Sequence, residues 1–165
     1  MHLIIDILSH ITSEVTWHHF GTGPELSKIQ ELSRKLQPAV KHVFHGYVPN
    51  RDFLRFISEN EISFFINVSE FEGIPVTLIE AASLGIPLIG TDTCGIPEIV
   101  TNETGFLIPL KFDPASVAIL IESEHFKKDI YQKKFRLRVQ EYYNLNFSAS
   151  KNFTALGNYL QKISK

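Results

Sequence analysis

Two carboxylates, Glu72 and Glu80, stand on either side of the start of an expected helix that begins near Pro75 and follows a buried strand. The first backbone N–H groups of a helix lack partners within it and carry partial positive charge, so they suit a phosphate. Glu80 lies about 8 Å along the helix axis from Pro75. A carboxylate on each side of a bound phosphate can accept hydrogen bonds from hydroxyl groups of the same ligand. This spacing fits a diphosphate with a sugar at one end and a ribose at the other.

The same two residues also fit a purely structural interpretation. A loop glutamate such as Glu72 is usually solvated, and Glu80 could cap or pair on a helix surface. Glu80 nevertheless lies between Leu78-Ile79 and Ala81-Ala82, on a helix with little polar surface, where a charge needs a partner. The residues alone therefore leave the ligand interpretation and the structural one open.

The elements around this segment alternate between strands and helices joined by short loops. Strands are expected over 15–20, 42–47, 62–68, 87–91 and 105–108. Helices are expected over 3–11, 26–36, 51–60, 75–84 and 96–101, and a further helix is expected to start after Asp113. Residues 124–165 predict two amphipathic helices, broken around 144–146. Asn50 and Asp113 are expected helix caps, Pro24 fits a first helical turn, and Gly85 ends a helix.

This alternation predicts an α/β fold, a Rossmann-like parallel sheet with helices on both faces. Such sheets bind ligands at the carboxyl ends of their strands, where Glu72 is expected. The length of 165 residues predicts a single domain over 1–165, with a core over 1–123 and C-terminal helices over 124–165.

Composition and charge narrow the function classes. With 16 basic and 18 acidic residues the chain lacks the basic excess of a nucleic-acid-binding surface, so we expect no nucleic-acid partner. The one cysteine, Cys94, excludes an internal disulfide and a cysteine-rich zinc site. A lone free thiol suits a reducing compartment, which predicts a cytoplasmic protein. No apolar run approaches the ~20 residues of a membrane-spanning helix.

Two further patterns have simpler explanations than a ligand site. His18 and His19 are adjacent on a strand, so their rings point to opposite faces, and we expect no metal site there or at His42 and His45. The segment 21–23 lacks the third glycine of a dinucleotide-binding motif and predicts a tight turn before a helix.

Five elements in order resemble the retaining glycosyltransferases of family four. Glu72 and Glu80 match the E-x7-E signature of that family, and the segments that match its other motifs are 20–24, 43–48, 94–100 and 104–109. The resemblance covers roughly residues 15 to 109. It implies a GT-B fold, in which two Rossmann-like domains enclose a cleft, and it implies that this chain is the C-terminal, nucleotide-sugar-binding half.

The resemblance also implies residue roles. Glu72 would act as the catalytic residue that contacts and orients the donor sugar, and Glu80 would hold the ribose. The other donor-binding residues it implies are Gly73, Ile74, Pro75, Val76 and Thr77 along the diphosphate or sugar, and Gly46, Tyr47 and Val48 near the base. Catalysis would rest on positioning and on stabilising the leaving diphosphate, with no cofactor, metal or established protein nucleophile.

The sequence departs from the family in two places. Pro75 replaces a glycine of many relatives and lacks an N–H. Relatives begin this domain with a strand carrying a Gly-Arg element and then a lysine, and neither cation has an obvious counterpart here. That strand would lie between the strands at Val15 and Ile62, so we expect a gap or a rearrangement in the sheet, with exposed edges that invite self-association.

The resemblance predicts a hexosyltransferase-type enzyme that moves a sugar, with retention, from a nucleotide-diphosphate sugar to a glycan or lipid-linked acceptor. Bacterial surface polysaccharide or lipopolysaccharide synthesis is the expected process, with peripheral association of the full-length protein with the inner membrane face. The partner would be an N-terminal acceptor-binding domain absent from this chain, and the chain alone is expected to be inactive. Alternatives are a non-catalytic module that binds nucleotide sugar or a partner, and, more weakly, an epimerase or a phosphorylase.

Overall fold

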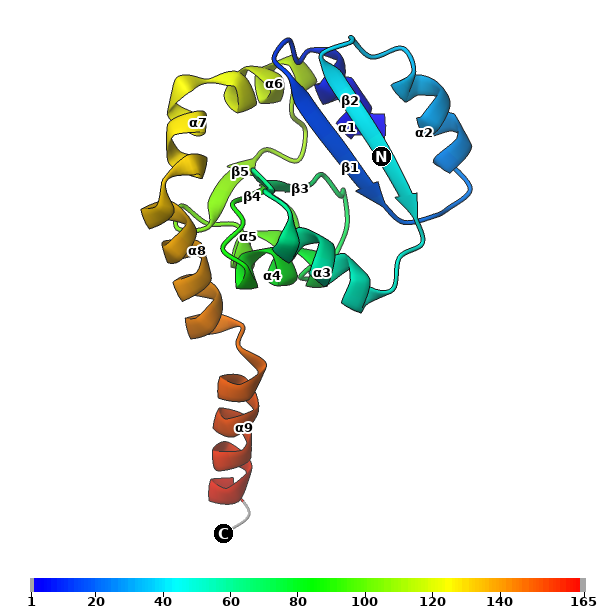
Figure 1. The fold of residues 1–165 in the computed structure, drawn as a ribbon. Coiled ribbons are helices and arrows are strands. Elements are labelled where there is room, and N and C mark those ends of the chain that lie inside the picture. Colours follow the sequence, from blue (N-terminus) through cyan, green and yellow to red (C-terminus); the bar gives the residue numbers. More distant parts are fainter. Residues whose placement is uncertain (1, 164–165) are drawn as a thin grey trace.

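The computed structural model describes residues 2–163, in which helices and parallel strands alternate (Figure 1). The first half contains the helices α1 (His2–Ser9) and α2 (Leu26–Ser33) and the strands β1 (Val15–Phe20) and β2 (Val40–Gly46). β1 pairs with β2 in parallel, with Val15 opposite Val40 and His19 opposite Phe44. The predicted strand over 15–20 and helix over 3–11 are confirmed, the helix with an earlier end.

A second parallel sheet follows, with the order β3-β4-β5. Its strands are β3 (Phe65–Asn67), β4 (Leu88–Thr91) and β5 (Gly105–Ile108). The helices around it are α3 (Asn50–Glu59), α4 (Val76–Ser83), α5 (Ile96–Ile99) and α6 (Pro114–Glu122). Every residue of β4 is buried, as expected for a central strand with neighbours on both sides and covered faces.

The strands thus form two separate sheets, which confirms the expected gap. Within residues 2–163, β1 pairs only with β2, and β3 pairs only with β4. The strand predicted over 62–68 shortens to the three half-buried residues of β3. Its pairing with β4 covers only Phe65 to Asn67, opposite Leu88 to Gly90.

Side-chain packing holds the two sheets together across this gap. Phe53 of α3 contacts Phe20 of β1 at a ring-centroid distance of 5.1 Å and Phe65 of β3 at 6.3 Å. These rings belong to a core cluster that also includes Leu78 and Leu88. On the other face, a second cluster joins residues of the two sheets with those of α1, α6 and α7.

Several helix ends differ from the sequence expectation. Asn50 is the first residue of α3 rather than its cap; Pro49 takes the cap position, and no side chain there caps the helix. Pro24 lies before α2, which begins at Leu26. The cap at Asp113 is confirmed, because its side chain accepts a hydrogen bond from the Ser116 N–H.

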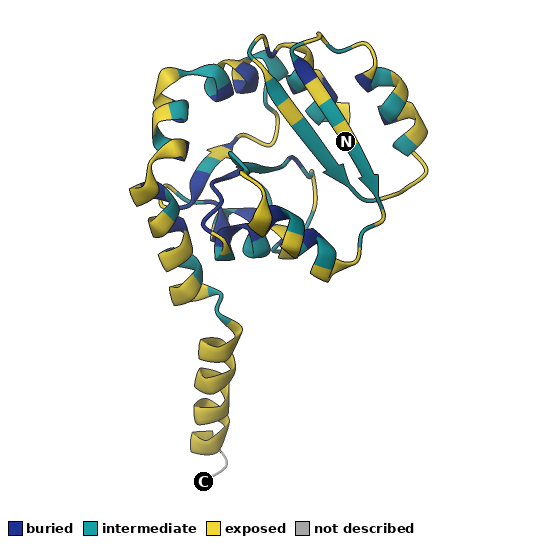
Figure 2. Cartoon of the chain, in the orientation of Figure 1, coloured by how far each residue is buried: buried dark blue, intermediate teal, exposed yellow. Residues whose placement is uncertain are grey.

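The C-terminal region contains three helices instead of the predicted two, namely α7 (Glu124–Tyr131), α8 (Lys133–Asn146) and α9 (Ala149–Ile163). The break falls at 147–148, and an additional one occurs at Gln132. α8 buries Phe135 and Val139 against α4, whereas α9 has no buried residue and points away from the body (Figures 1 and 2). No helix in residues 2–163 has the length and hydropathy to cross a membrane.

Candidate functional site

Glu72 lies in the loop after β3 and is held by the last residue of that strand. The Asn67 side-chain Nδ2 donates to Glu72 Oε2 at 3.0 Å. The Asn67 Oδ1 accepts from the Ser69 backbone N–H at 2.9 Å. Glu72 is therefore half-buried and fixed in place, in contrast to the solvated loop glutamate of the structural interpretation.

The loop that carries Glu72 is also tied to the end of β4 and the segment after it. Thr91 Oγ1 donates to the Ser69 carbonyl at 2.6 Å, and Thr93 Oγ1 donates to the Glu70 carbonyl at 3.1 Å. A Cβ on Gly95 would lie 2.7 Å from Ile74 Cγ1. The loop can pack this closely only because residue 95 is a glycine.

Glu80 lies in the second turn of α4, where one of its oxygens has a partner and the other has none. The Asn50 side-chain Nδ2 donates to Glu80 Oε1 at 2.7 Å. Glu80 Oε2 is buried and makes no hydrogen bond with the described residues. A buried carboxylate oxygen without a donor is costly, so this atom is a natural acceptor for a ligand hydroxyl.

The amino end of α4 separates the two carboxylates and leaves donors unused. Pro75 is the cap residue and makes no side-chain cap hydrogen bond. No acceptor among the described residues takes the backbone N–H of Val76 or Thr77. Both side chains are exposed, and Val76 retains 65% of its accessible surface. This helix end is therefore open to an anion.

The predicted base-binding segment, Gly46 to Val48, ends two residues before Asn50. Because the Asn50 side chain donates to Glu80, this segment is held near the Glu80 carboxylate. Gly46 has φ +66°, and its carbonyl accepts from the Gly21 N–H at 2.8 Å, so the loops after β1 and β2 meet. Tyr47 is 78% exposed, while Val48 packs against the core. The turn before α2 falls at 24–25 instead of the predicted 21–23, because the Leu26 N–H donates to the Gly23 carbonyl at 3.1 Å and closes the turn over Pro24 and Glu25.

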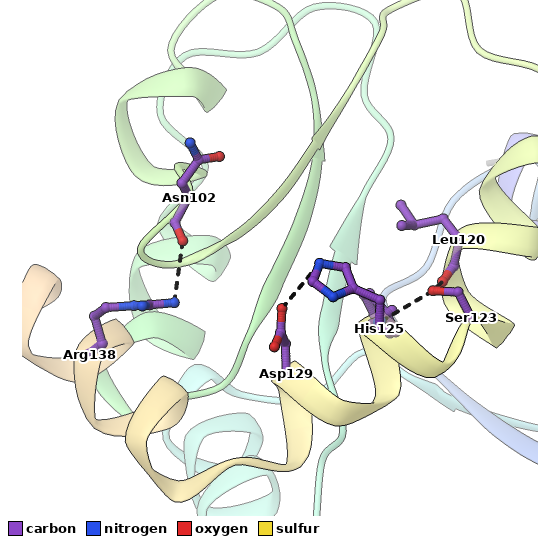
Figure 3. Close-up of polar contacts among 7 residues, drawn as sticks. Asn102, Leu120, Ser123, His125, Asp129 and Arg138 are labelled. Atoms are coloured by element: carbon purple, nitrogen blue, oxygen red, sulfur yellow. Dashed lines mark hydrogen bonds and ion pairs between the residues drawn. The ribbon is translucent and has the colours of Figure 1, made fainter.

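Hollows elsewhere on the described surface do not coincide with these residues. One of about 320 Å³ is lined by Leu84, Tyr131 and Arg136, among others. Another of about 440 Å³ lies beside β5. Two of its lining residues are Asn102 and Arg138, and Figure 3 shows Arg138 donating to the Asn102 carbonyl, at 3.5 Å. Neither of these two hollows is lined by Glu72 or Glu80.

The histidines lie on the two faces of the β1-β2 sheet. His18 Nδ1 lies 3.0 Å from His45 Nε2, whereas His19 packs near Trp17 and Phe44 on the other face. Burial lowers the pKa of His18 below its usual value of 6.5, and the neighbouring His45 lowers it further. In the part of the chain that the structure describes, no group of three or more His, Cys, Asp or Glu residues is placed to hold a metal ion.

Comparison with known families identifies the family to which the chain belongs. The model of the family described as glycosyl transferases group 1 matches residues 1–136. The chain belongs to this family. The matched segment includes Glu72, Glu80, Asn50 and Asn67 and the loops after β2, β3 and β4.

Relatives of this glycosyltransferase chain have names from bacterial polysaccharide synthesis. It is 32% identical over 100 residues to an amylovoran biosynthesis glycosyltransferase of Erwinia amylovora, covering 58% of this chain and 24% of the relative. It is 28% identical over 145 residues to a putative teichuronic acid biosynthesis glycosyltransferase of Bacillus subtilis, covering 88% of this chain and 34% of that relative. The chain thus spans a quarter to a third of the length of these relatives.

Solved structures confirm the fold class. The HepE protein of Anabaena, solved in complex with UDP, superposes with a TM-score of 0.78 at 19% identity, covering 98% of this chain and 45% of that protein. Sucrose-phosphate synthase from Thermosynechococcus elongatus superposes with a TM-score of 0.77 at 19% identity, covering 98% of this chain and 41% of that protein. The fold of this glycosyltransferase chain is that of the C-terminal Rossmann-like domain of GT-B enzymes.

Sequence reasoning missed the residues that hold the two glutamates of the glycosyltransferase motif. Asn50 was expected only as a helix cap, and no role was expected for Asn67, Thr91 or Thr93. The available signal was that polar residues at the ends of buried strands and at helix starts need hydrogen-bond partners. Which partner each would find depends on contacts between elements distant in the sequence.

Proposed function

We propose that this chain is the donor-binding part of a retaining glycosyltransferase that uses a nucleotide-diphosphate sugar. The observation that carries the proposal is the buried, unpartnered Oε2 of Glu80 beside the open amino end of α4. A ribose hydroxyl would donate to that oxygen, and the diphosphate would accept from the N–H groups of Val76 and Thr77. Glu72 would then accept from hydroxyls of the transferred sugar.

This arrangement assigns the protein a positioning and electrostatic role. The N–H groups at the start of α4 would stabilise the negative charge that develops on the leaving diphosphate. Glu72 would orient the sugar for attack by the acceptor on the same face from which the diphosphate departs. No covalent intermediate with the protein is required.

The acceptor site forms the second part of the proposal. The bacterial relatives are about three to four times as long as their matched segments, which supports a further, acceptor-binding domain in the functional enzyme. We therefore expect the chain to bind donor but to transfer sugar only when that domain is supplied. Names of relatives in amylovoran and teichuronic acid synthesis support a surface-polysaccharide acceptor.

A cytoplasmic location with peripheral attachment to an anionic membrane face completes the proposal. Residues 124–165 contain nine lysines and arginines against three acidic residues, while residues 1–123 contain seven against fifteen. The exposed helix α9 contains no acidic residue and presents Phe153 at 73% exposure. A basic region with exposed apolar side chains favours such a surface.

Calorimetry with UDP and a panel of nucleotide sugars tests the donor site. Glu80→Ala is expected to weaken binding of every nucleoside diphosphate, whereas Glu72→Ala is expected to reduce mainly the discrimination between sugars. Equal affinity of both variants and the unchanged chain for all ligands would rule out the assignment. An assay with a separately produced acceptor-binding domain then tests transfer.

The second candidate is a non-catalytic module that binds a nucleotide sugar or a partner protein. It is favoured by one observation: residues 56–110, which include β3, α4 and β4, contain no lysine or arginine. A diphosphate bound at the start of α4 would therefore receive no cationic side chain from β3, α4 or β4 to stabilise its charge. Donor binding without any transfer in the presence of the acceptor domain would select this candidate.

A further inference from the structure

Each glutamate of the candidate site is held by one asparagine side chain, and this pairing suggests a role for the asparagines. We propose that Asn50 and Asn67 are positioning residues that fix Glu80 and Glu72 for the ligand. The inference rests on the proposed donor-binding function. It assigns no contact with ligand to either asparagine, and it predicts how their replacement changes affinity and sugar discrimination.

The contacts of Asn50 argue against a purely local role. A residue at the start of a helix commonly uses its side chain to cap that helix. Asn50 is the first residue of α3, but no side chain caps this helix, and the Asn50 amide instead reaches Glu80 of α4 at 2.7 Å. The amide therefore fixes one carboxylate oxygen and leaves Oε2 directed elsewhere, buried and unpartnered.

Asn67 uses both ends of its side chain. Its oxygen accepts from the Ser69 N–H, which shapes the start of the loop after β3, and its nitrogen donates to Glu72 Oε2. One residue therefore connects the strand end, the loop backbone and the carboxylate. The two functions can be separated experimentally, because aspartate keeps the acceptor oxygen and loses the donor nitrogen.

A neutral amide has a specific advantage over a cation as the partner of a binding carboxylate. Lysine or arginine would neutralise the charge, whereas an amide donor restricts the carboxylate rotamer and leaves its negative charge available. No ion pair among residues 2–163 involves Glu72 or Glu80. Carboxylates that are held before the ligand arrives lose less conformational entropy on binding.

The test is calorimetric titration of the chain with UDP and with UDP-glucose. Asn50→Asp removes the donor and places a second negative charge beside Glu80, so UDP affinity is expected to fall about tenfold or more. Asn67→Asp is expected to reduce the gain in affinity of UDP-glucose over UDP while UDP binding changes little. Asn60→Asp is the matched control, because Asn60 bonds only the Phe56 carbonyl at the far end of α3.

A reversed pair separates positioning from general stability. In the double variant Asn50→Asp, Glu80→Gln, the amide introduced on α4 donates to the carboxylate introduced on α3 and keeps its own oxygen free as an acceptor. This double variant is expected to bind UDP more tightly than Asn50→Asp alone. Thermal unfolding of each variant monitors folding, and Asn50→Ser, which cannot reach Glu80, replaces Asn50→Asp if that variant fails to fold.

The outcomes distinguish this inference from the proposed function. If the unchanged chain binds neither UDP nor UDP-glucose, the donor-binding function fails and the positioning inference fails with it. If the unchanged chain binds, but Asn50→Asp and Asn67→Asp both bind like Asn60→Asp, only the positioning inference is overturned. A reversed pair no better than Asn50→Asp alone would likewise contradict positioning by Asn50.

Discussion

The Glu122 carboxylate at the end of α6 accepts a hydrogen bond from the Thr12 backbone N–H at 2.8 Å, which joins two segments 110 residues apart. The Ser13 N–H donates to the same carboxylate at 2.6 Å. This contact fixes the turn between α1 and β1 against the end of α6.

The pH dependence of stability follows from this contact. Partial burial raises the pKa of Glu122, but the hydrogen bonds from Ser13 and Thr12 outweigh it and lower the pKa from 4.5 to about 2. Because the folded-state pKa is depressed, the stabilisation is complete above about pH 4.5 and is lost as the pH falls towards 2. Urea unfolding is therefore expected to give Glu122→Gln a lower free energy of unfolding than the unchanged chain at pH 7, and this difference is expected to shrink as the pH falls towards 2. The exposed Glu31→Gln serves as control, and a deficit independent of pH would contradict this account.

Gly95 permits the close packing of the loop that carries Glu72, so its replacement is expected to impair the proposed donor binding. A Cβ at this position would lie 2.7 Å from Ile74 Cγ1 and 2.9 Å from the Gly73 carbonyl carbon. Gly95→Ala should displace the loop that carries Glu72 and destabilise the fold by about 1–3 kcal/mol. Calorimetry with UDP-glucose and urea unfolding measure both effects. Gly23→Ala, where a Cβ meets nothing within 4 Å, is expected to change neither.

The Thr104 hydroxyl is fully buried and joins backbone groups of the turn before β5. It donates to the Ile99 carbonyl at 2.5 Å and accepts from the Thr101 N–H at 2.8 Å. Thr104→Val keeps the shape but leaves these groups without partners, at an expected cost of about 1–3 kcal/mol. Thr16→Val, on the exposed side of β1, is the matched control. Equal unfolding free energies for the two variants would show that the hydroxyl contributes nothing.

The unpaired edges of β1 and β3 predict concentration-dependent self-association. An exposed strand edge offers backbone donors and acceptors to a second chain. Sedimentation equilibrium over a range of protein concentrations is expected to show dimers or larger species. The exposed apolar side chains of α9 provide an alternative interface, so the variant Phe153→Ser separates the two explanations. Association that disappears in Phe153→Ser would assign it to α9 and not to the strand edges.

Particular residues show why the sequence predicted some features and not others. The strand from Gly105 to Ile108 and the cap at Asp113 depend on neighbours in the sequence, and both predictions are confirmed. The gap in the sheet followed from counting strands against the family pattern. Asn50 shows the limit of local reasoning: its preference for helix starts was clear, but the choice of Glu80 as partner depends on how α3 packs beside α4.

The roles of Glu72 and Glu80, unlike the strand and the helix cap, are not tested by the structure. The sequence pattern predicted them, and the geometry around them supports a ligand, but their contacts with a sugar and a ribose stay predictions. Their supporting residues were beyond sequence reasoning, because Thr91, Thr93 and Gly95 meet the Glu72 loop only after β3 and β4 have paired.

The bridge made by Phe53 has a mechanical consequence. Between β1 and β3 the described residues are joined by aromatic rings and not by backbone hydrogen bonds, and ring contacts tolerate small changes of angle that a ladder of N–H donors would resist. The placement of the half with β1 and β2 against the half with β3 to β5 therefore depends on side-chain packing, to which Phe53 contributes, and not on a backbone ladder. Since the loop before Asn50 belongs to the first half and Glu72 to the second, this packing also sets how far apart the two sides of the expected nucleotide surface lie.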